Sequence, residues 1–521
     1  MDDVPDEVGT GTRKILPWVW VACLLPLLGF WTYGLFDLDE GFYAGAAAEM
    51  LRRGEWTTPY FNGQTWFEKP ILLYWLSMPT IALFGGEFGT RLPSVLCGAG
   101  TLVVVFMAAK RWLGTSSAIW SILVLGSSVL AVGVNRMMLA DPPLVLAMTL
   151  CLLAFYASLS LDDGRKARVL AGAALGVAVL AKGPVAGLLF LLIAGWTLWR
   201  EPELRPRFRG GWFVAILAFC VVVGLWYVPA YLANGQVFVQ KFLIDQNIGR
   251  FTGGDTAHTL VGPENWVFFL VILLVGMLPW SLWIPRAWPR RNRDLGPEAI
   301  FLRFCAAWAG VVLLFFSVSG AKLPHYIAPA LPALSILVGD WLGRRRNPSV
   351  DMTSWRRLAG PLATCVIVAV VAQATFWGYY HGYGAPGSTI NRAFIGFHEE
   401  LHDLTRWVKR QGGPVAIYQM SRRDKADLGT GTVQLRETSH PSILFILDET
   451  VLDTELLGEL IAATETGKGR HIRYSIWVLT RADRFTNQDV SMAISFGLDL
   501  RDETPWPTRF YKVYRLTGYL K

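Results

Sequence analysis

The fold of this chain is decided at its start by one uninterrupted apolar stretch. Residues 15–36 read ILPWVWVACLLPLLGFWTYGLF, and they follow two basic residues, Arg13 and Lys14. A helix of that length covers about 33 Å, enough to cross the roughly 30 Å hydrocarbon core of a bilayer. The stretch is too long for the apolar part of a cleaved signal peptide, and no small-residue cleavage site follows it. The sequence therefore predicts a membrane helix that remains part of the chain.

Further apolar stretches along the chain have the same character. Ten of them lie near residues 92–109, 115–134, 142–161, 168–181, 184–199, 212–232, 266–285, 299–318, 324–342 and 358–380. Hydrophobic residues make up 53% of the chain and charged residues only 17%, against about 25% charge in a typical soluble domain. We therefore expect a polytopic α-helical membrane protein with about 11 transmembrane helices. No basic stripe or motif indicates a nucleic-acid partner.

The distribution of Lys and Arg orients these helices. When the N-terminus is placed in the cytoplasm, most basic residues fall in loops on that side, as the positive-inside rule requires. The run 71–84 is too short to span, and a crossing there would invert the charge bias. We expect an interfacial or half-inserted helix at that run, inside one long outer loop, 37–91. A loop of that length is usually functional.

After about residue 381 the composition becomes that of a soluble domain. The pattern predicts strands near 414–420, 442–447, 474–479 and 509–515, and amphipathic helices near 395–409 and 451–463. We expect a tail at 1–14, a transmembrane domain at 15–380 and a small soluble α/β domain at 381–521. An odd number of crossings places this last domain on the outer side. It contains no Gly-rich phosphate loop and no nucleophile motif.

Ionisable side chains near hydrocarbon are costly and are functional candidates by default. In this chain they gather in the connections assigned to the outer side. Six such connections with acids, bases or cations predict one polar cavity at the outer membrane boundary. These side chains in chain order are Asp37, Asp39, Glu40, Glu68, Lys69, Asp141, Lys182, Asp245, Arg250, His258, Lys322, His325 and Tyr326. All of them except Asp37, Asp245 and His325 are taken as candidate site residues.

The residue types indicate what such a cavity can do. The cations Lys69, Lys182, Arg250 and Lys322 are suited to hold a phosphate or pyrophosphate. Asp39 stands beside Glu40, so one carboxyl of the pair can have a raised pKa and serve as a base. Glu68 and His258 offer a hard oxygen and an imidazole, which could share one divalent metal ion.

Each candidate also has a structural interpretation. Asp39 and Glu40 can cap a helix N-terminus, and Lys69 can be an interfacial lysine whose stem lies along lipid. Lys182 can belong to a plain turn between helices, and the Lys322–Tyr326 segment can be an interfacial anchor. His258 alone is more often a loop histidine than a ligand. These interpretations explain single residues, but they do not explain why all the residues fall on one side.

Several short motifs resemble a known family. They are DEGFYA (39–44), GEWTTP (54–59), FEKPILLYW (67–75), RLPS (91–94), LADP (139–142), AKGP (181–184), NIGRF (247–251), LPW (278–280) and KLPHY (322–326). In this order they resemble the aminoarabinose transferase family, which modifies lipid A and groups with protein mannosyltransferase-like enzymes of GT-C fold. The resemblance covers residues 15 to about 345.

The resemblance implies a glycosyltransferase of the bacterial inner membrane that works on the periplasmic face. The donor is then a polyprenyl-phosphate-linked hexose or pentose, the acceptor is a lipid or protein, and transfer occurs in one inverting step. No nucleotide cofactor is implied, and one divalent metal ion (zinc, magnesium or manganese) is associated with the residues that match Glu68 and His258. The C-terminal domain would be periplasmic.

The resemblance also assigns roles to single residues. Asp39, next to Glu40, matches the catalytic acid/base, and Lys69 matches the lysine that holds phosphate. The cavity residues for donor phosphate or acceptor match Asp141, Lys182, Arg250 and Tyr326, with Lys322 in the same motif as Tyr326. The family often has arginine where this chain has Phe42.

Other functions remain open from the sequence. A protein O-mannosyltransferase of the same fold is the nearest alternative. A lipid or solute transporter would place charges at the bilayer midplane, often in two repeated halves, and no repeat is visible. A structural anchor for the outer domain would leave the outer charges without a role.

Overall fold

The structure is a computed structural model of the chain. It describes residues 10–37, 39–161, 164–208, 210–249, 264–289, 296–320, 322–344, 355–381, 398–420, 440–454, 456–460, 474–482, 484 and 487–518. The chain forms two compact units. One contains Met1–Phe30, Phe67–Phe84 and Phe88–Ala374, and the other contains Trp31–Trp66, Gly85–Glu87 and Thr375–Lys521.

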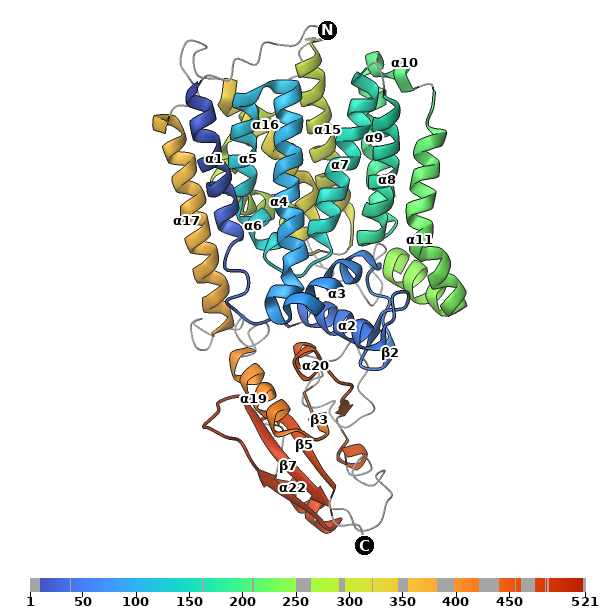
Figure 1. Cartoon of the computed structure of the whole chain (residues 1–521), viewed down its shortest axis with the longest axis vertical. Helices are drawn as coiled ribbons and strands as arrows, with labels where there is room; N and C mark the ends of the chain where they lie inside the picture. Colours follow the sequence, from blue (N-terminus) through green and yellow to red (C-terminus); the bar gives the residue numbers. More distant parts are fainter. Residues whose placement is uncertain are drawn as a thin grey trace. The chain divides into compact units, whose positions relative to one another are not determined.

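The first unit is built from apolar helices (Figure 1). Its longer helices are α1 (Thr10–Leu24), α3 (Leu72–Phe84), α4 (Gly86–Leu113), α5 (Thr115–Gly126), α6 (Val129–Asn135), α7 (Asp141–Ser160), α8 (Arg165–Lys182), α9 (Val185–Arg200), α11 (Phe213–Phe238), α13 (Glu264–Gly276), α15 (Pro297–Val318), α16 (Leu331–Arg344) and α17 (Trp355–Tyr380). Shorter turns are η1 (Leu25–Leu27), η2 (Pro202–Leu204), α10 (Arg205–Phe208), the π-helical η3 (Val239–Gly249), η4 (Trp280–Trp283), α14 (Ile284–Ala287) and η5 (Pro324–Ala330). Each predicted apolar stretch overlaps at least one of these elements, and 266–285 overlaps three, α13, η4 and α14. The stretch 15–36 is helical only as far as Leu27, so its last residues do not continue the predicted helix.

Fewer described helices meet the length and composition of a membrane crossing than the eleven that the sequence predicts. Six described helices are long and apolar enough to span, and two bent pairs raise the number to eight. One pair bends by 65° between α5 and α6, and the other by 111° between α13 and the turns that follow it. The apolar helices at Lys14–Leu27 and Val185–Arg200 are shorter, as is α3. The expected eleven crossings are therefore not confirmed by these helix lengths.

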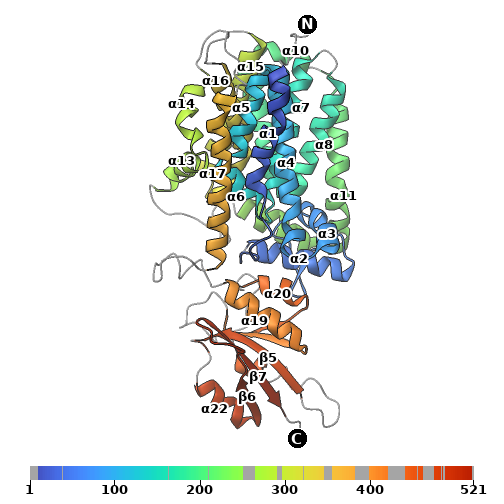
Figure 2. The ribbon, with the colours of Figure 1, turned by 60° about the vertical axis from the view of Figure 1, so that its left-hand side comes forward.

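Close contacts between backbones hold the helices of this unit together. Helix α8 packs between α7 and α11, and the three run side by side in both views (Figures 1 and 2). A Cβ atom at Gly172 would lie 2.0 Å from the carbonyl oxygen of Ala215, so α8 and α11 touch where only glycine fits. Gly339 makes a similar approach to Ser121, where its Cβ position would lie 2.5 Å from the backbone nitrogen. Small residues of this kind allow membrane helices to approach without large side chains between them.

The second unit contains a five-stranded sheet in the order β4-β3-β5-β7-β6. Its strands are β3 (Val415–Tyr418), β4 (Leu452–Thr454), β5 (Tyr474–Arg481), β6 (Leu498–Asp502) and β7 (Tyr511–Gly518). Strand β3 is parallel to β4 and β5, whereas β7 is antiparallel to β5 and β6. Helix α19 (His398–Gln411) packs on β7, and α22 (Asn487–Ser495) packs next to β6 (Figure 2).

Two elements of this unit differ from the sequence-based prediction. Residues 442–447, predicted as a strand, form the short helix α20 (Ser442–Leu447). The helix predicted from residue 451 begins instead with strand β4. Runs such as Ser-Ile-Leu-Phe-Ile-Leu fit a buried strand or a buried helix equally well, so tertiary packing decides between them. Here Pro441 precedes the helix, and a carboxylate accepts a hydrogen bond from the Ser442 N–H.

Part of the predicted outer loop groups with the C-terminal residues. Helix α2 (Asp39–Arg53) and the small hairpin of β1 (Tyr60–Phe61) and β2 (Gln64–Thr65) belong to the second unit. Helix α2 packs on α20. The rest of the loop, including α3 and the residues just before it, belongs mainly to the first unit.

Candidate active site

A buried ion pair joins the ends of two neighbouring helices in the first unit. Asp141 is the first residue of α7, where Pro142 and Pro143 suit a helix start and a carboxylate is favoured by the helix dipole. Lys182 is the last residue of α8, which Gly183 ends with a φ of 84°. The Lys182 Nζ atom lies 2.5 Å from the Asp141 Oδ1 atom. Only 12% and 3% of the two side chains are exposed, so this pair is shielded from water.

Further polar side chains surround this pair. The His325 Nε2 atom lies 3.7 Å from the Asp141 Oδ2 atom. The Lys182 Nζ atom lies 4.5 Å from the centroid of the Tyr326 ring, a cation–π arrangement. Lys69 interacts electrostatically with the Asp141 carboxylate. We name Lys69, Asp141, Lys182, His325 and Tyr326 the Asp141 cluster.

The charges of the Asp141 cluster are suited to binding an anion. Two lysines and a histidine face one carboxylate, so these side chains together favour an additional anion. Charge-assisted bonds to a phosphate are stronger in a place from which water is excluded. The sequence places His325 among the polar residues of the outer connections, next to Tyr326, but it was not given a role in the site. The signal that could have identified it is its position directly before Tyr326 in an outer connection.

Lys322 has a structural task in the same connection. Its Nζ atom donates hydrogen bonds to the carbonyl oxygens of Phe316 at 2.7 Å and Ser317 at 2.8 Å, near the C-terminus of α15. The ammonium also lies 5.0 Å from the centroid of the Phe269 ring. Burial lowers the pKa of Lys322 below its ordinary value. A cation at a helix C-terminus is favoured by the helix dipole, so Lys322 caps α15.

Asp39 and Glu40 begin α2 in the second unit. The Tyr43 hydroxyl donates to the Asp39 Oδ1 atom at 3.3 Å. Glu40 is fully buried and accepts a hydrogen bond from the Phe36 N–H at 3.0 Å. Glu40 therefore stabilises the start of α2, as its structural interpretation predicts. Asp39 is half-buried one position earlier.

Phe42 occupies an apolar setting. Its ring stacks on Trp66 with centroids 4.7 Å apart and lies 4.9 Å from the ring of Phe61. All three side chains are buried. Where the family often has an arginine, this chain therefore has part of a small aromatic core.

The predicted metal ligands are only partly described. Glu68 is half-buried just before α3, whereas His258 and Arg250 lie outside the described residues. Among the residues that the structure describes, no three His, Cys, Asp or Glu side chains come together as metal ligands would. The described side chains thus do not make up a metal site.

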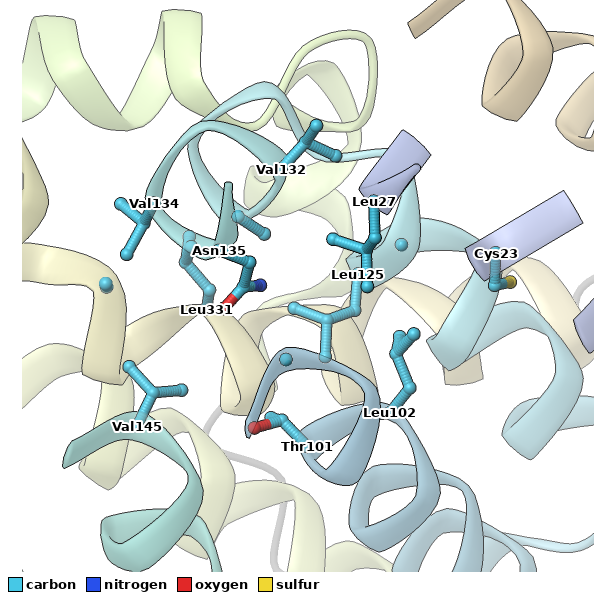
Figure 3. A pocket seen from close by; sticks show the side chains of 14 residues that line it. Cys23, Leu27, Thr101, Leu102, Leu125, Val132, Val134, Asn135, Val145 and Leu331 are labelled. Atoms are coloured by element: carbon cyan, nitrogen blue, oxygen red, sulfur yellow. The ribbon is translucent and has the colours of Figure 1, made fainter. Parts of the chain in front are cut away.

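An apolar cavity lies among helices of the first unit. Of the residues that line it, Thr101 and Asn135 have the clearly polar side chains, and Leu27, Leu102 and Leu331 are among the apolar ones (Figure 3). The Thr101 hydroxyl donates to the Cys97 carbonyl oxygen in its own helix at 2.8 Å. The lining contains no acid and no cation, so this cavity suits hydrocarbon and is not a reaction centre.

Comparisons with known proteins agree with the motifs. Residues 68–227 match the family model described as dolichyl-phosphate-mannose-protein mannosyltransferase. An undecaprenyl phosphate-alpha-4-amino-4-deoxy-L-arabinose arabinosyl transferase of Pseudomonas paraeruginosa is 34% identical over 325 residues, 60% of this chain and 56% of the relative. A similarly named transferase of Pseudomonas fluorescens is 34% identical over 349 residues, 64% of this chain and 57% of the relative. The chain thus matches little more than half the length of these relatives.

The fold is matched over nearly the whole chain. The crystal structure of ArnT from Cupriavidus metallidurans bound to undecaprenyl phosphate superposes with a TM-score of 0.72, covering 97% of this chain and 98% of that one at 21% identity. The resemblance deduced from the motifs is therefore confirmed in sequence and in fold. This chain is thus similar in sequence to undecaprenyl-phosphate aminoarabinose transferases over 60–64% of its length, and it has the helical fold of ArnT.

Proposed function

We propose that this chain is a membrane glycosyltransferase that moves a sugar from a polyprenyl-phosphate donor to a lipid acceptor such as lipid A, or to another envelope acceptor. The observation that carries the proposal is the Asp141 cluster, where two lysines and a histidine surround one buried carboxylate. Such a group is suited to a lipid phosphate, since it offers several donors with little competition from water. The names of the relatives supply the donor class.

The proposed topology follows from charge. We place the N-terminal tail, 1–14, in the cytoplasm and the transmembrane domain at 15–380 with about eleven crossings, counting the short helices as spans. The outer catalytic loop is 37–91, and the α/β domain, 381–521, is periplasmic. The excess of Lys and Arg in loops on one side supports this orientation in a bacterial inner membrane.

The proposed mechanism is a single displacement. An acceptor oxygen attacks the anomeric carbon of the donor from the side opposite the phosphate, and the bond from that carbon to the phosphate oxygen breaks. The configuration inverts, and the lipid phosphate leaves as an anion. Lys69 and Lys182, with Arg250, stabilise the charge that develops on the leaving group. Asp141 holds the Lys182 ammonium in position.

Asp39 has a role that depends on the acceptor. If the acceptor is a hydroxyl, Asp39 takes its proton, with Glu40 fixing the start of α2. If the acceptor is itself a phosphate, no proton is transferred and Asp39 orients the acceptor or balances charge. Tyr326 is proposed to act beside Lys182, and Lys322 to hold the end of α15 through its two hydrogen bonds. Glu68 and His258 are proposed as ligands of a divalent metal ion, through which no step is derived.

A second candidate is protein O-mannosyl transfer. The match of residues 68–227 to the mannosyltransferase family model favours it. Both candidates use a lipid-phosphate sugar, so the acceptor separates them. A transporter has less support, since the candidate charges stand at helix ends rather than in mid-helix.

The decisive experiment identifies the acceptor. Purified full-length chain in lipid nanodiscs is given an undecaprenyl-phosphate sugar and either lipid A or an envelope protein extract, and products are identified by mass spectrometry. We expect the mass of one sugar to be added to the lipid. Sugar found only on protein would support the second candidate. Absence of any transfer, together with unchanged envelope lipids and glycoproteins in a deletion strain, would overturn both.

A further inference from the structure

We propose that the C-terminal residues His440 and Ser442 position helix α2, and with it Asp39, by binding the carboxylate of Asp37. The proposal rests on the proposed function, since it assigns a catalytic role to Asp39. It gives the C-terminal domain a task that no motif of that domain reveals. The residues involved all belong to the second unit.

The central contact is a carboxylate bound by two donors. The Asp37 Oδ1 atom accepts a hydrogen bond from the Ser442 N–H at 2.9 Å, and the Oδ2 atom lies 3.0 Å from the His440 Nδ1 atom. Only 4% of the Asp37 side chain and 7% of the His440 side chain are exposed. A carboxylate buried in this way is expensive to leave without its partners. The contact is therefore a strong restraint on Asp37, which stands two positions before Asp39 in the chain.

The donors are themselves anchored in the domain. The His440 Nε2 atom lies 3.2 Å from the Tyr511 hydroxyl on β7. Burial raises the pKa of Tyr511, so the phenol stays protonated and can donate. Then Nε2 accepts, and Nδ1 carries the proton directed at Asp37. This arrangement connects strand β7 to Asp37, two positions before the first residue of α2.

Ser442 is anchored in a similar way. Its Oγ atom lies 2.8 Å from the His402 Nε2 atom on α19, and the His402 Nδ1 atom lies 3.1 Å from the Tyr380 hydroxyl. Ser442 and His402 are almost completely buried. Both donors to Asp37 are thus part of buried networks that cannot shift without breaking further bonds.

The backbone of α2 also touches this segment. A Cβ atom at Gly41 would lie 2.6 Å from the Ser442 backbone nitrogen and 2.8 Å from the Pro441 side chain, so only glycine fits there. Beyond the other end of α2, Asn62 exchanges two hydrogen bonds of 3.0 Å with the backbone of Val451. Residues 440–451 therefore hold α2 and the hairpin after it at both ends.

A restraint of this kind matters for catalysis because the rate depends on the placement of a catalytic group within fractions of an ångström. A purely structural contact would affect only folding. A positioning contact affects turnover when folding and donor binding are intact. These two cases give different results in kinetics and in hydrogen exchange.

The test uses the full-length chain with three variants. His440→Leu removes the donor, His440→Asn places an amide near the former Nδ1 position, and Gly41→Ala disturbs the same contact without changing a buried charge. We expect kcat to fall about 10- to 100-fold in His440→Leu and Gly41→Ala with KM for the donor little changed. His440→Asn should restore kcat to within about 3-fold of the original chain. Lys512→Ala, which breaks an exposed pair with Asp502 in the same domain, is the matched control and should leave kcat unchanged.

A second readout does not depend on activity. Hydrogen–deuterium exchange of the α2 amides should accelerate in His440→Leu and Gly41→Ala and remain slow in His440→Asn and Lys512→Ala. Unchanged exchange in the first two variants would overturn the proposal, as would faster exchange with unchanged kcat. If the original chain transfers no sugar, the proposed function fails, and exchange still decides whether His440 holds α2.

Discussion

The Nζ atom of Lys182 lies 2.5 Å from the Oδ1 atom of Asp141, at the point where α8 ends and α7 begins. Both side chains are largely buried, so water cannot solvate either charge if the other is removed. Pairs of this kind add little net stability but are costly to break on one side. In this chain the pair also fixes the direction of a cation that we propose to hold a lipid phosphate.

The first prediction concerns this pair. Asp141→Asn should lower the free energy of unfolding by about 3–5 kcal/mol, because the Lys182 charge stays buried without an opposite charge. The measurement is unfolding of the purified chain in mixed micelles. The double variant Asp141→Asn with Lys182→Met should recover most of this loss without recovering transfer. Additive losses in the double variant would contradict the pairing.

A second prediction concerns Lys69. Lys69→Ala should weaken binding of undecaprenyl phosphate about 10- to 100-fold, as expected for loss of one charge-assisted hydrogen bond. Binding is measured by displacement of a fluorescent polyprenyl phosphate in nanodiscs. Lys69→Arg keeps the charge and should lose much less. Equal affinity of Lys69→Ala and the original chain would remove Lys69 from the proposed phosphate site.

The third prediction distinguishes two roles for Lys322, that of a helix cap and that of a direct ligand of the donor phosphate. The Lys322 ammonium is bonded to two carbonyl oxygens of α15. Lys322→Met should therefore lower stability by about 1–3 kcal/mol, the cost of carbonyls left without donors. Donor affinity should change less than in Lys69→Ala when both are measured in the same displacement assay. A larger loss of affinity than in Lys69→Ala would instead make Lys322 a direct phosphate ligand.

The fourth prediction concerns the aromatic core around Phe42. Phe42→Ala should destabilise the chain by about 3–5 kcal/mol, because it leaves a cavity against Trp66 and Phe61. Phe42→Arg should be no more active than the original chain, since the new charge would enter this buried cluster. Unfolding measurements and sugar transfer check the two variants. Increased transfer by Phe42→Arg would contradict this expectation and would show that an arginine at position 42 contributes to the reaction.

Much of the helical architecture could be predicted from the sequence. Each predicted apolar stretch overlaps at least one helix, because segment length and composition are local properties and the bilayer selects apolar helices of sufficient length. The run 71–84 was likewise predicted as a separate short helix, and α3 (Leu72–Phe84) is that helix. The bends within the two broken pairs could not be predicted, because they depend on how neighbouring helices pack.

The candidate site was predictable only as a set of residue types. Asp141 and Lys182 both stood out as charges at helix ends, but their pairing arises from the packing of α7 on α8. Lys322 stood out equally, yet its ammonium is bonded to a helix end. Sequence position does not reveal the direction of a long side chain, so these two outcomes could not be distinguished beforehand.

What the sequence by itself determined is the class of protein: a chain of apolar helices with its scarce charges between them, followed by a soluble domain. Only the tertiary structure decided that residues 442–447 form a helix, that Phe42 packs in an aromatic core, and that Asp37 is bound by residues 403 and 405 positions later. The physical reason is that hydrophobic length is encoded within each segment. The partner of a buried polar group is chosen when distant segments pack together, because only then does leaving it unpaired become costly.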